Sequence, residues 1–136
     1  MERQVKETSN CITYTYADTK LSKEEMLGYI IDIMNDDDIT ANGLVLVAPE
    51  DNNSWDGTLT EIPSTPDRDD FVENYKDAAL TCVTAVIQYH GQQLMITYRP
   101  ETNMFSVILP KEFKDTIDDV EKNVIPDAID ANGPTA

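Results

Sequence analysis

The sequence predicts an α+β fold: one antiparallel or mixed sheet, including a C-terminal three-strand meander, packed with about three helices. Short segments with alternating apolar residues indicate strands, and apolar stripes at helical spacing indicate helices. The distribution of charge agrees with this, because residues 80–109 carry only Arg99 and Glu101 in a chain whose formal net charge is -16. A neutral block of strands is therefore surrounded by segments rich in carboxylates.

The chain is expected to begin with a polar lead-in over residues 1–9, followed by a strand over residues 11–16. In this strand Ile12, Tyr14 and Tyr16 share one face, and threonines occupy the other.

A first helix is predicted after Ser22, which forms a capping box with Glu25. Leu21 stands before the cap as one half of a hydrophobic staple. The apolar stripe consists of Met26, Leu27, Ile30, Ile33 and Met34, and the helix should end within residues 35–38.

Residues 43–48 are almost entirely apolar and predict a buried strand. Residues 49–65 have the composition of a loop that contains one large aromatic side chain, Trp55, with a short strand at 59–62.

A second helix is expected to open with Thr65 as its cap and Pro66 at its first position. Its inner stripe would consist of Phe71, Tyr75, Ala78 and Ala79. The β-branched residues after Leu80 favour a strand, although a single helix continuing to residue 89 is the competing interpretation.

Three strands with turns at 89–92 and 100–103 make up the meander. One of its faces is expected to point to the core. The other face is weakly polar, and either a helix or a partner should cover Cys82, Val86, Met95, Thr97, Met104 and Ile108.

A last helix is predicted from Pro110 to Pro126, with an inner stripe of Phe113, Ile117, Val120 and Val124. Residues 127–136 lack apolar periodicity and are expected to be a mobile tail, which leaves residues 1–126 as a single acidic domain.

Composition limits the kinds of partner. Asp and Glu number 26 against 10 Lys and Arg, so the surface repels nucleic acid and anionic membranes and attracts basic proteins. Solubility or a halophilic origin is the alternative explanation of the charge. The two cysteines indicate a reducing compartment, and no apolar run suggests a signal peptide or membrane span, so a cytoplasmic protein is expected.

The strongest candidate site is a stripe of carboxylates, Asp69, Glu73 and Asp77, with Asp70 beside them. Like charges at this spacing oppose their own helix by about 0.2–0.5 kcal/mol per contact, so the stripe calls for a reason. One interpretation is a mimic of a phosphate backbone. The other is an ordinary solvated face, with Arg68 and Lys76 relieving the repulsion.

Two further groups are candidates for partner binding: the acidic run Asp36, Asp37 and Asp38, and Trp55. The acidic run does not match a calcium loop, because glycine and glutamate are missing from the required positions. Acid at a helix C-terminus is unfavourable, which suggests retention for a partner. Trp55 is either an interface anchor or a pin that holds its loop to the core.

No motif predicts catalysis, a metal site or a cofactor. His90 is the only histidine and stands at a turn, and no glycine-rich phosphate loop occurs. Arg99 is expected to form an ion pair with Glu101 across the second turn of the meander.

The preferred hypothesis is a non-enzymatic inhibitor or decoy that occupies a basic surface of a partner protein, such as a nucleic-acid-binding enzyme. It would bind no nucleic acid or membrane itself, and its composition is typical of phage anti-defence and bacterial immunity proteins. The alternative is a self-associating module that binds a small ligand or peptide between sheet and helices, with Met95, Met104 and Ile108 in the contact between copies.

Overall fold

The computed structural model describes residues 3–16, 21–50, 53–62 and 65–125, with the backbone alone at 3, 48–50 and 53–61. Within these ranges, seven strands, three α-helices and one 3-10 helix follow one another. In order they are β1 (Arg3–Glu7), β2 (Cys11–Tyr16), α1 (Lys23–Met34), β3 (Ile39–Glu50), β4 (Asn53–Ile62), α2 (Arg68–Tyr75), β5 (Cys82–Tyr89), β6 (Gln92–Arg99), β7 (Met104–Pro110), η1 (Lys111–Thr116) and α3 (Ile117–Asn123).

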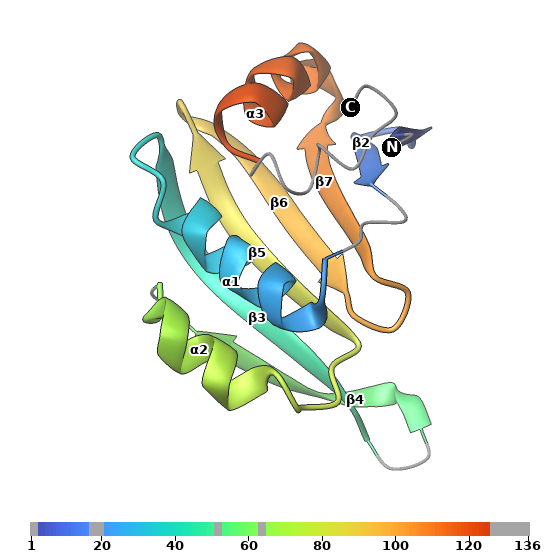
Figure 1. Cartoon of the computed structure of the whole chain (residues 1–136). Coiled ribbons are helices and arrows are strands. Elements are labelled where there is room, and N and C mark those ends of the chain that lie inside the picture. Colours follow the sequence, from blue (N-terminus) through green and yellow to red (C-terminus); the bar gives the residue numbers. More distant parts are fainter. Residues whose placement is uncertain (1–2, 17–20, 51–52, 63–64, 126–136) are drawn as a thin grey trace.

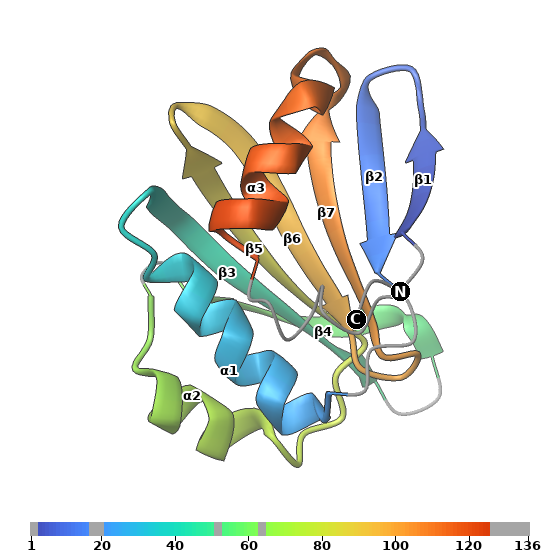
Figure 2. The same ribbon diagram turned by 45° about the horizontal axis from the view of Figure 1, so that its top comes forward.

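All seven strands form one sheet in the order β1-β2-β7-β6-β5-β3-β4, and every neighbouring pair is antiparallel. The helices lie on one face of this sheet, α1 and α2 side by side over one half and α3 over the other (Figure 1). The rotated view shows the same two-layer arrangement, and no helix of the described residues lies on the second face of the sheet (Figure 2). The predicted α+β class is confirmed.

Strict alternation in the central strands separates a core face from an open face. Along β5, β7 and β2 every second residue is buried, and the residues between are half exposed. The buried set meets the helices in one continuous core, in which the rings of Tyr16 and Phe105 pack at a tilt of 51° with centroids 6.0 Å apart. The meander does point one face to the core, as predicted, and the residues of β6 and β7 on that face are buried: Leu94, Ile96, Tyr98, Phe105, Val107 and Leu109.

The first helix forms as the sequence predicts. Ser22 accepts the backbone N–H of Glu25 at 3.1 Å, and the Glu25 side chain accepts the N–H of Ser22 at 3.0 Å, which completes the capping box. All five residues of the predicted apolar stripe are buried.

Two segments predicted to be irregular are strands. Residues 3–7 pair with β2, so residues 1–9 are not merely a polar lead-in. The segment predicted as a loop with a short strand holds the whole of β4, which pairs with β3. β3 begins at Ile39 rather than at residue 43, because a bulge between Ala41 and Gly43 lets the strand continue through the Asn-Gly step.

The second helix is shorter than predicted at both ends. Asp67, not Thr65, is its cap, and its carboxylate accepts the N–H of Asp70 at 3.1 Å. Aspartate is the stronger cap because its charge also suits the helix N-terminus. The helix ends at Tyr75, so Ala78 and Ala79 are outside it. Residues 82–89 are strand β5, and the interpretation of one long helix is wrong.

The last helical segment is split. Residues 111–116 form a 3-10 turn, broken at Phe113 (φ -106, ψ 19), before α3 begins. The Tyr14 hydroxyl donates to the Lys114 carbonyl at 3.4 Å, which ties this turn to β2. Phe113 is therefore only half-buried, whereas Ile117, Val120 and Val124 reach the core. Residues 127–136 are outside the described residues, so the predicted tail stays a prediction.

Candidate functional site

The helices α1 and α2 pack antiparallel. Near the start of α2, Arg68 Nε lies 3.4 Å from a carboxylate oxygen of Asp32 on α1. At the other end, Lys23 of α1 donates to the carbonyl oxygen of Ala78, just after α2. A Cβ at Gly28 would lie 2.8 Å from an Arg68 guanidinium nitrogen, so this glycine allows the arginine to approach the face of α1.

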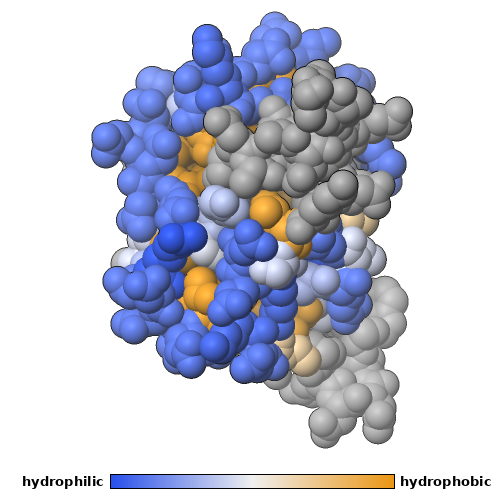
Figure 3. Space-filling model, in the orientation of Figure 1, coloured by the Kyte–Doolittle hydropathy of each residue, from blue (hydrophilic) through white to orange (hydrophobic). Residues whose placement is uncertain are grey.

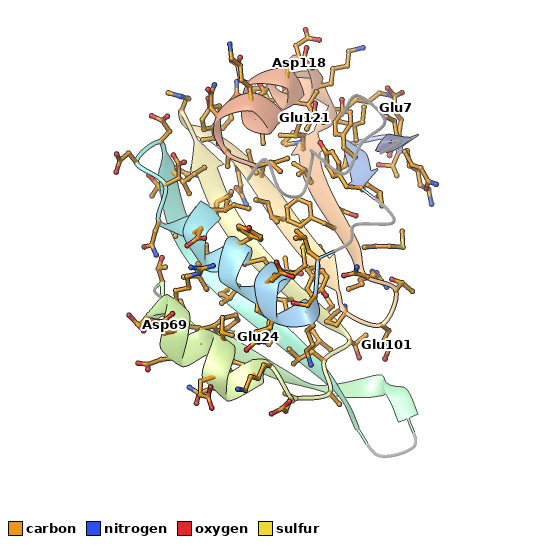
Figure 4. All side chains as sticks on the ribbon, in the orientation of Figure 1. Glu7, Glu24, Asp69, Glu101, Asp118 and Glu121 are labelled. Carbon is orange, nitrogen blue, oxygen red and sulfur yellow. The ribbon has the colours of Figure 1, made fainter. Side chains whose placement is uncertain are left out.

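Between these helices lies a hollow of about 410 Å³, which we call the acidic groove. Four of its six lining residues are acids and one, Arg68, is a base; the full lining is Glu24, Glu25, Arg68, Asp69, Val72 and Glu73. Glu24 and Asp69 come from the two neighbouring helices on the helix-covered side (Figure 4). This side is predominantly hydrophilic where its residues are described (Figure 3).

Arg68, which lines the groove, and Lys76, which pairs with the lining residue Glu73, are both already engaged by carboxylates. Lys76 Nζ lies 3.0 Å from a carboxylate oxygen of Glu73, and Arg68 pairs with Asp32. The pKa of Lys76 is raised, first by the hydrogen bond and charge of Glu73, and further by the charges of Glu24 and Asp77. Glu73 of α2 and Glu24 of α1 thus act on the same ammonium group, and acids still outnumber bases in the groove.

The predicted carboxylate stripe is therefore rearranged. Asp69 and Glu73 stand in the groove, but Asp77 lies in the turn after α2, so the three do not form a single helical row. Asp70 is exposed in the first turn of α2, where acid suits the helix dipole.

The other predicted partner-binding residues lie elsewhere. Asp36, Asp37 and Asp38 follow the far end of α1, about 18 Å along the helix axis from Glu24. Asp36 accepts the backbone N–H of Asp38 at 2.9 Å, a local turn contact that gives this acid a structural role. Trp55 lies within β4 rather than in a loop, and its side chain is outside the described part of the structure.

The sequence alone did not indicate Glu24 and Glu25 as site residues. Both lie in the first turn of α1, where the capping box and the helix dipole explain their presence. Only the antiparallel packing of α1 on α2 brings them beside Asp69 and Glu73. The available signal was Gly28, since a glycine inside a helix often marks a close approach by another segment.

The open face of the sheet has the opposite chemistry. Strands β2, β7, β6 and β5 contribute no carboxylate to it; their outward residues are Cys11, Thr13, Thr15, Met104, Ser106, Ile108, Pro110, Gln93, Met95, Thr97, Arg99, Cys82, Thr84, Val86 and Gln88. In the register of the sheet these form transverse rows. One row is hydroxylic, with Thr15, Ser106, Thr97 and Thr84 in line, and the next is mainly apolar, with Thr13, Ile108, Met95 and Val86.

The hydroxyl groups of the first row satisfy one another. Thr15 and Ser106 are 3.0 Å apart at their oxygens, and Thr84 and Thr97 are 3.2 Å apart. A hollow of about 430 Å³ crosses this row towards β1, and Lys6 and Arg99 are the charged residues of its lining. Within the described chain neither cation has an ion-pair partner, so the predicted contact of Arg99 with Glu101 is not formed.

Other candidate groups form no chemical centre. His90 is exposed in the β5–β6 turn with φ 50, its ring against that of Tyr89. In the part of the chain that the structure describes, no group of three or more His, Cys, Asp or Glu side chains is placed to hold a metal ion. No helix in the described ranges has the length and apolar character needed to cross a membrane.

Comparison with known proteins gives no relative. No family model matches the chain, no curated protein matches it in sequence, and no solved structure matches its fold.

Proposed function

We propose that this chain is a non-enzymatic acidic binding protein, an inhibitor or decoy that occupies a cationic surface of a partner protein. The observation that supports this most is the acidic groove, where carboxylates from α1 and α2 outnumber cations that are themselves already paired. Two helices supply the charge, so it is held in a fixed pattern rather than on a loop.

The chemistry of the groove suits a basic partner. A net charge of -16 steers cationic proteins from a distance, and steering raises association rates strongly at low salt. The groove then provides a local array of acceptors for Lys or Arg side chains. A protein that normally binds a nucleic-acid backbone carries such side chains in rows, which makes it the partner class we favour.

The alternative of a ligand held between sheet and helices has less support. That space is filled by side chains of both layers, and the core residues there are nearly all fully buried. Self-association, the other half of that hypothesis, concerns the open face of the sheet instead.

The test compares two variants of equal charge. The groove variant carries Glu24→Gln, Asp69→Asn and Glu73→Gln, and the control variant carries Glu112→Gln, Asp115→Asn and Asp118→Asn on exposed positions of η1 and α3. Binding of a fluorescent oligolysine peptide is measured by anisotropy at low and at physiological ionic strength.

We expect the groove variant to bind the peptide at least about tenfold more weakly than the control variant, because it loses the local array and both have the same net charge. The parent protein should lose affinity steeply as salt rises. Equal binding by the two variants would show that total charge alone attracts the peptide, and the groove would then not be the binding site.

A further inference from the structure

We propose that the open face of the sheet is the contact surface between two copies of this chain. This goes beyond the proposed function, because it concerns the opposite side of the molecule from the acidic groove. The occupant is a second copy, packed face to face as in a two-sheet sandwich.

Charge is the first argument. The chain carries 26 acidic residues, yet the outward positions of β2, β7, β6 and β5 include none. Interface centres are depleted in charge and enriched in methionine, with charged residues at the rim. Met95 and Ile108 stand at the centre of the face, whereas Arg99 ends β6 and Lys6 belongs to the outermost strand.

The cost of removing the open face from water is also low. Hydroxyl groups normally resist burial because they lose their hydrogen bonds to water. Here the Thr15–Ser106 and Thr84–Thr97 pairs already bond across strands. Burying this row against a second copy therefore leaves fewer polar groups unsatisfied than its composition suggests.

Area is the third argument. With strands about 4.8 Å apart and about 3.4 Å per residue, the five strands β2, β7, β6, β5 and β3 present about 650 Å² per copy. Two such faces bury about 1,300 Å², which is within the range of specific, stable interfaces. The outward side chains of β3, Val45 and Val47, extend the apolar part of this surface.

The proposal predicts a distinctive dependence on salt. Each copy carries a net charge of -16, so the two repel one another, and added salt screens that repulsion. Dimerisation should therefore strengthen as salt rises, whereas binding of a cationic partner in the groove should weaken. The two proposals fail or hold independently.

The experiment is sedimentation velocity on the whole chain from about 1 µM to about 1 mM, at low and high salt. We expect the mass to rise from 15.3 kDa towards twice that value, with the midpoint at lower protein concentration in high salt. Met95→Glu and Ile108→Glu should each raise the midpoint concentration at least about tenfold, because each places facing carboxylates at the centre.

Ala79→Glu is the matched control, since it adds the same charge at an exposed position between α2 and β5. Far-UV circular dichroism checks that each variant folds. If a glutamate variant does not fold, Met95→Lys is tested in its place, because the lysine stem keeps the apolar packing. A chain that stays at 15.3 kDa throughout overturns the proposal. So does weakening of the dimer by salt, or equal dimerisation of the Met95 and Ala79 variants.

Discussion

The two faces of the sheet are built from alternate residues of the same strands, yet they differ in almost every physical property. On β7, Phe105 is fully buried beneath the helix layer, while its neighbour Ser106 is half exposed and bonded to Thr15. The covered face holds aromatic and branched aliphatic side chains. The open face holds hydroxyl groups, methionines and no carboxylate on its four central strands.

This difference indicates that the residues of the two faces have different roles. Burial against the helices supplies the stability of the fold, because removing apolar area from water is the largest favourable contribution. The open face contributes less to folding, so its composition is freer to serve an interaction. The carboxylates labelled in Figure 4 stand on the three α-helices, at the end of β1 and in the β6–β7 turn.

The largest expected effect on the free energy of unfolding comes from truncating a core side chain, compared with truncating its neighbour on the open face. Phe105→Ala should lower the free energy of unfolding by about 3–5 kcal/mol, because it leaves a cavity beside Tyr16. Met104→Ala, one residue earlier on the open face, should lower it by less than about 1 kcal/mol. Urea denaturation monitored by fluorescence measures both, and similar losses for the two would contradict the assignment of faces.

The parts of the fold predicted correctly are those that local sequence specifies. The capping box at Ser22 and the alternation in residues 82–109 are complete signals within a few residues. They required no knowledge of distant partners. The covered and open faces of the meander could therefore be assigned from the sequence.

The errors occur where a distant contact decides the structure. The strand β1 is polar and lies at the sheet edge, so it has no alternating pattern, and its pairing with β2 makes it a strand. The end of α2 is similar: Thr81 donates to the Val47 carbonyl at 2.7 Å, which draws the chain onto β3 although helical spacing continues.

The candidate site was predicted only in part for the same reason. Asp69 and Glu73 could be identified within one segment, but the groove also needs Glu24 and Glu25 from a helix more than forty residues earlier in the chain. No pattern within either helix specifies that the two pack antiparallel.

A second prediction concerns the hydroxyl group of Tyr98, which lies on the covered face. Tyr98 donates to Asn103 at 3.1 Å, and Asn103 in turn donates to the Leu21 carbonyl at 3.2 Å. Tyr98→Phe should lower the free energy of unfolding by about 1 kcal/mol at neutral pH, because this hydrogen bond is lost. The matched open-face change Thr97→Val, which removes an outward hydroxyl, should have a smaller effect.

The same tyrosine gives a pH dependence with a defined sign. Burial raises the pKa of Tyr98 to about 12, from 10.0 in an exposed tyrosine. The unfolded chain therefore loses this proton first, and the contribution of Tyr98 to stability, fully present below pH 10, is lost as pH rises towards 12. Thermal unfolding across this range should show a smaller decline in Tyr98→Phe than in the parent. An equal decline in the two proteins would show that folding does not shield the Tyr98 phenol from ionisation.

The smallest effect is expected in the helix layer, at Gly28. A substitution there should change the stability of the fold and the position of Arg68 in the groove in different ways. Alanine is favoured over glycine inside a helix by about 1 kcal/mol, and the three atoms nearest to the new Cβ all belong to the end of the flexible Arg68 side chain. Gly28→Ala should therefore raise the free energy of unfolding by about 0.5–1 kcal/mol, since displacing Arg68 breaks only an exposed ion pair with Asp32. Arg68→Ala is the control, because it removes the ion pair with Asp32 without the gain in helix propensity at position 28. Chemical denaturation compares the stability of the Gly28→Ala and Arg68→Ala variants. A destabilised Gly28→Ala variant would mean that Arg68 is held rigidly against α1 and cannot yield to the new Cβ.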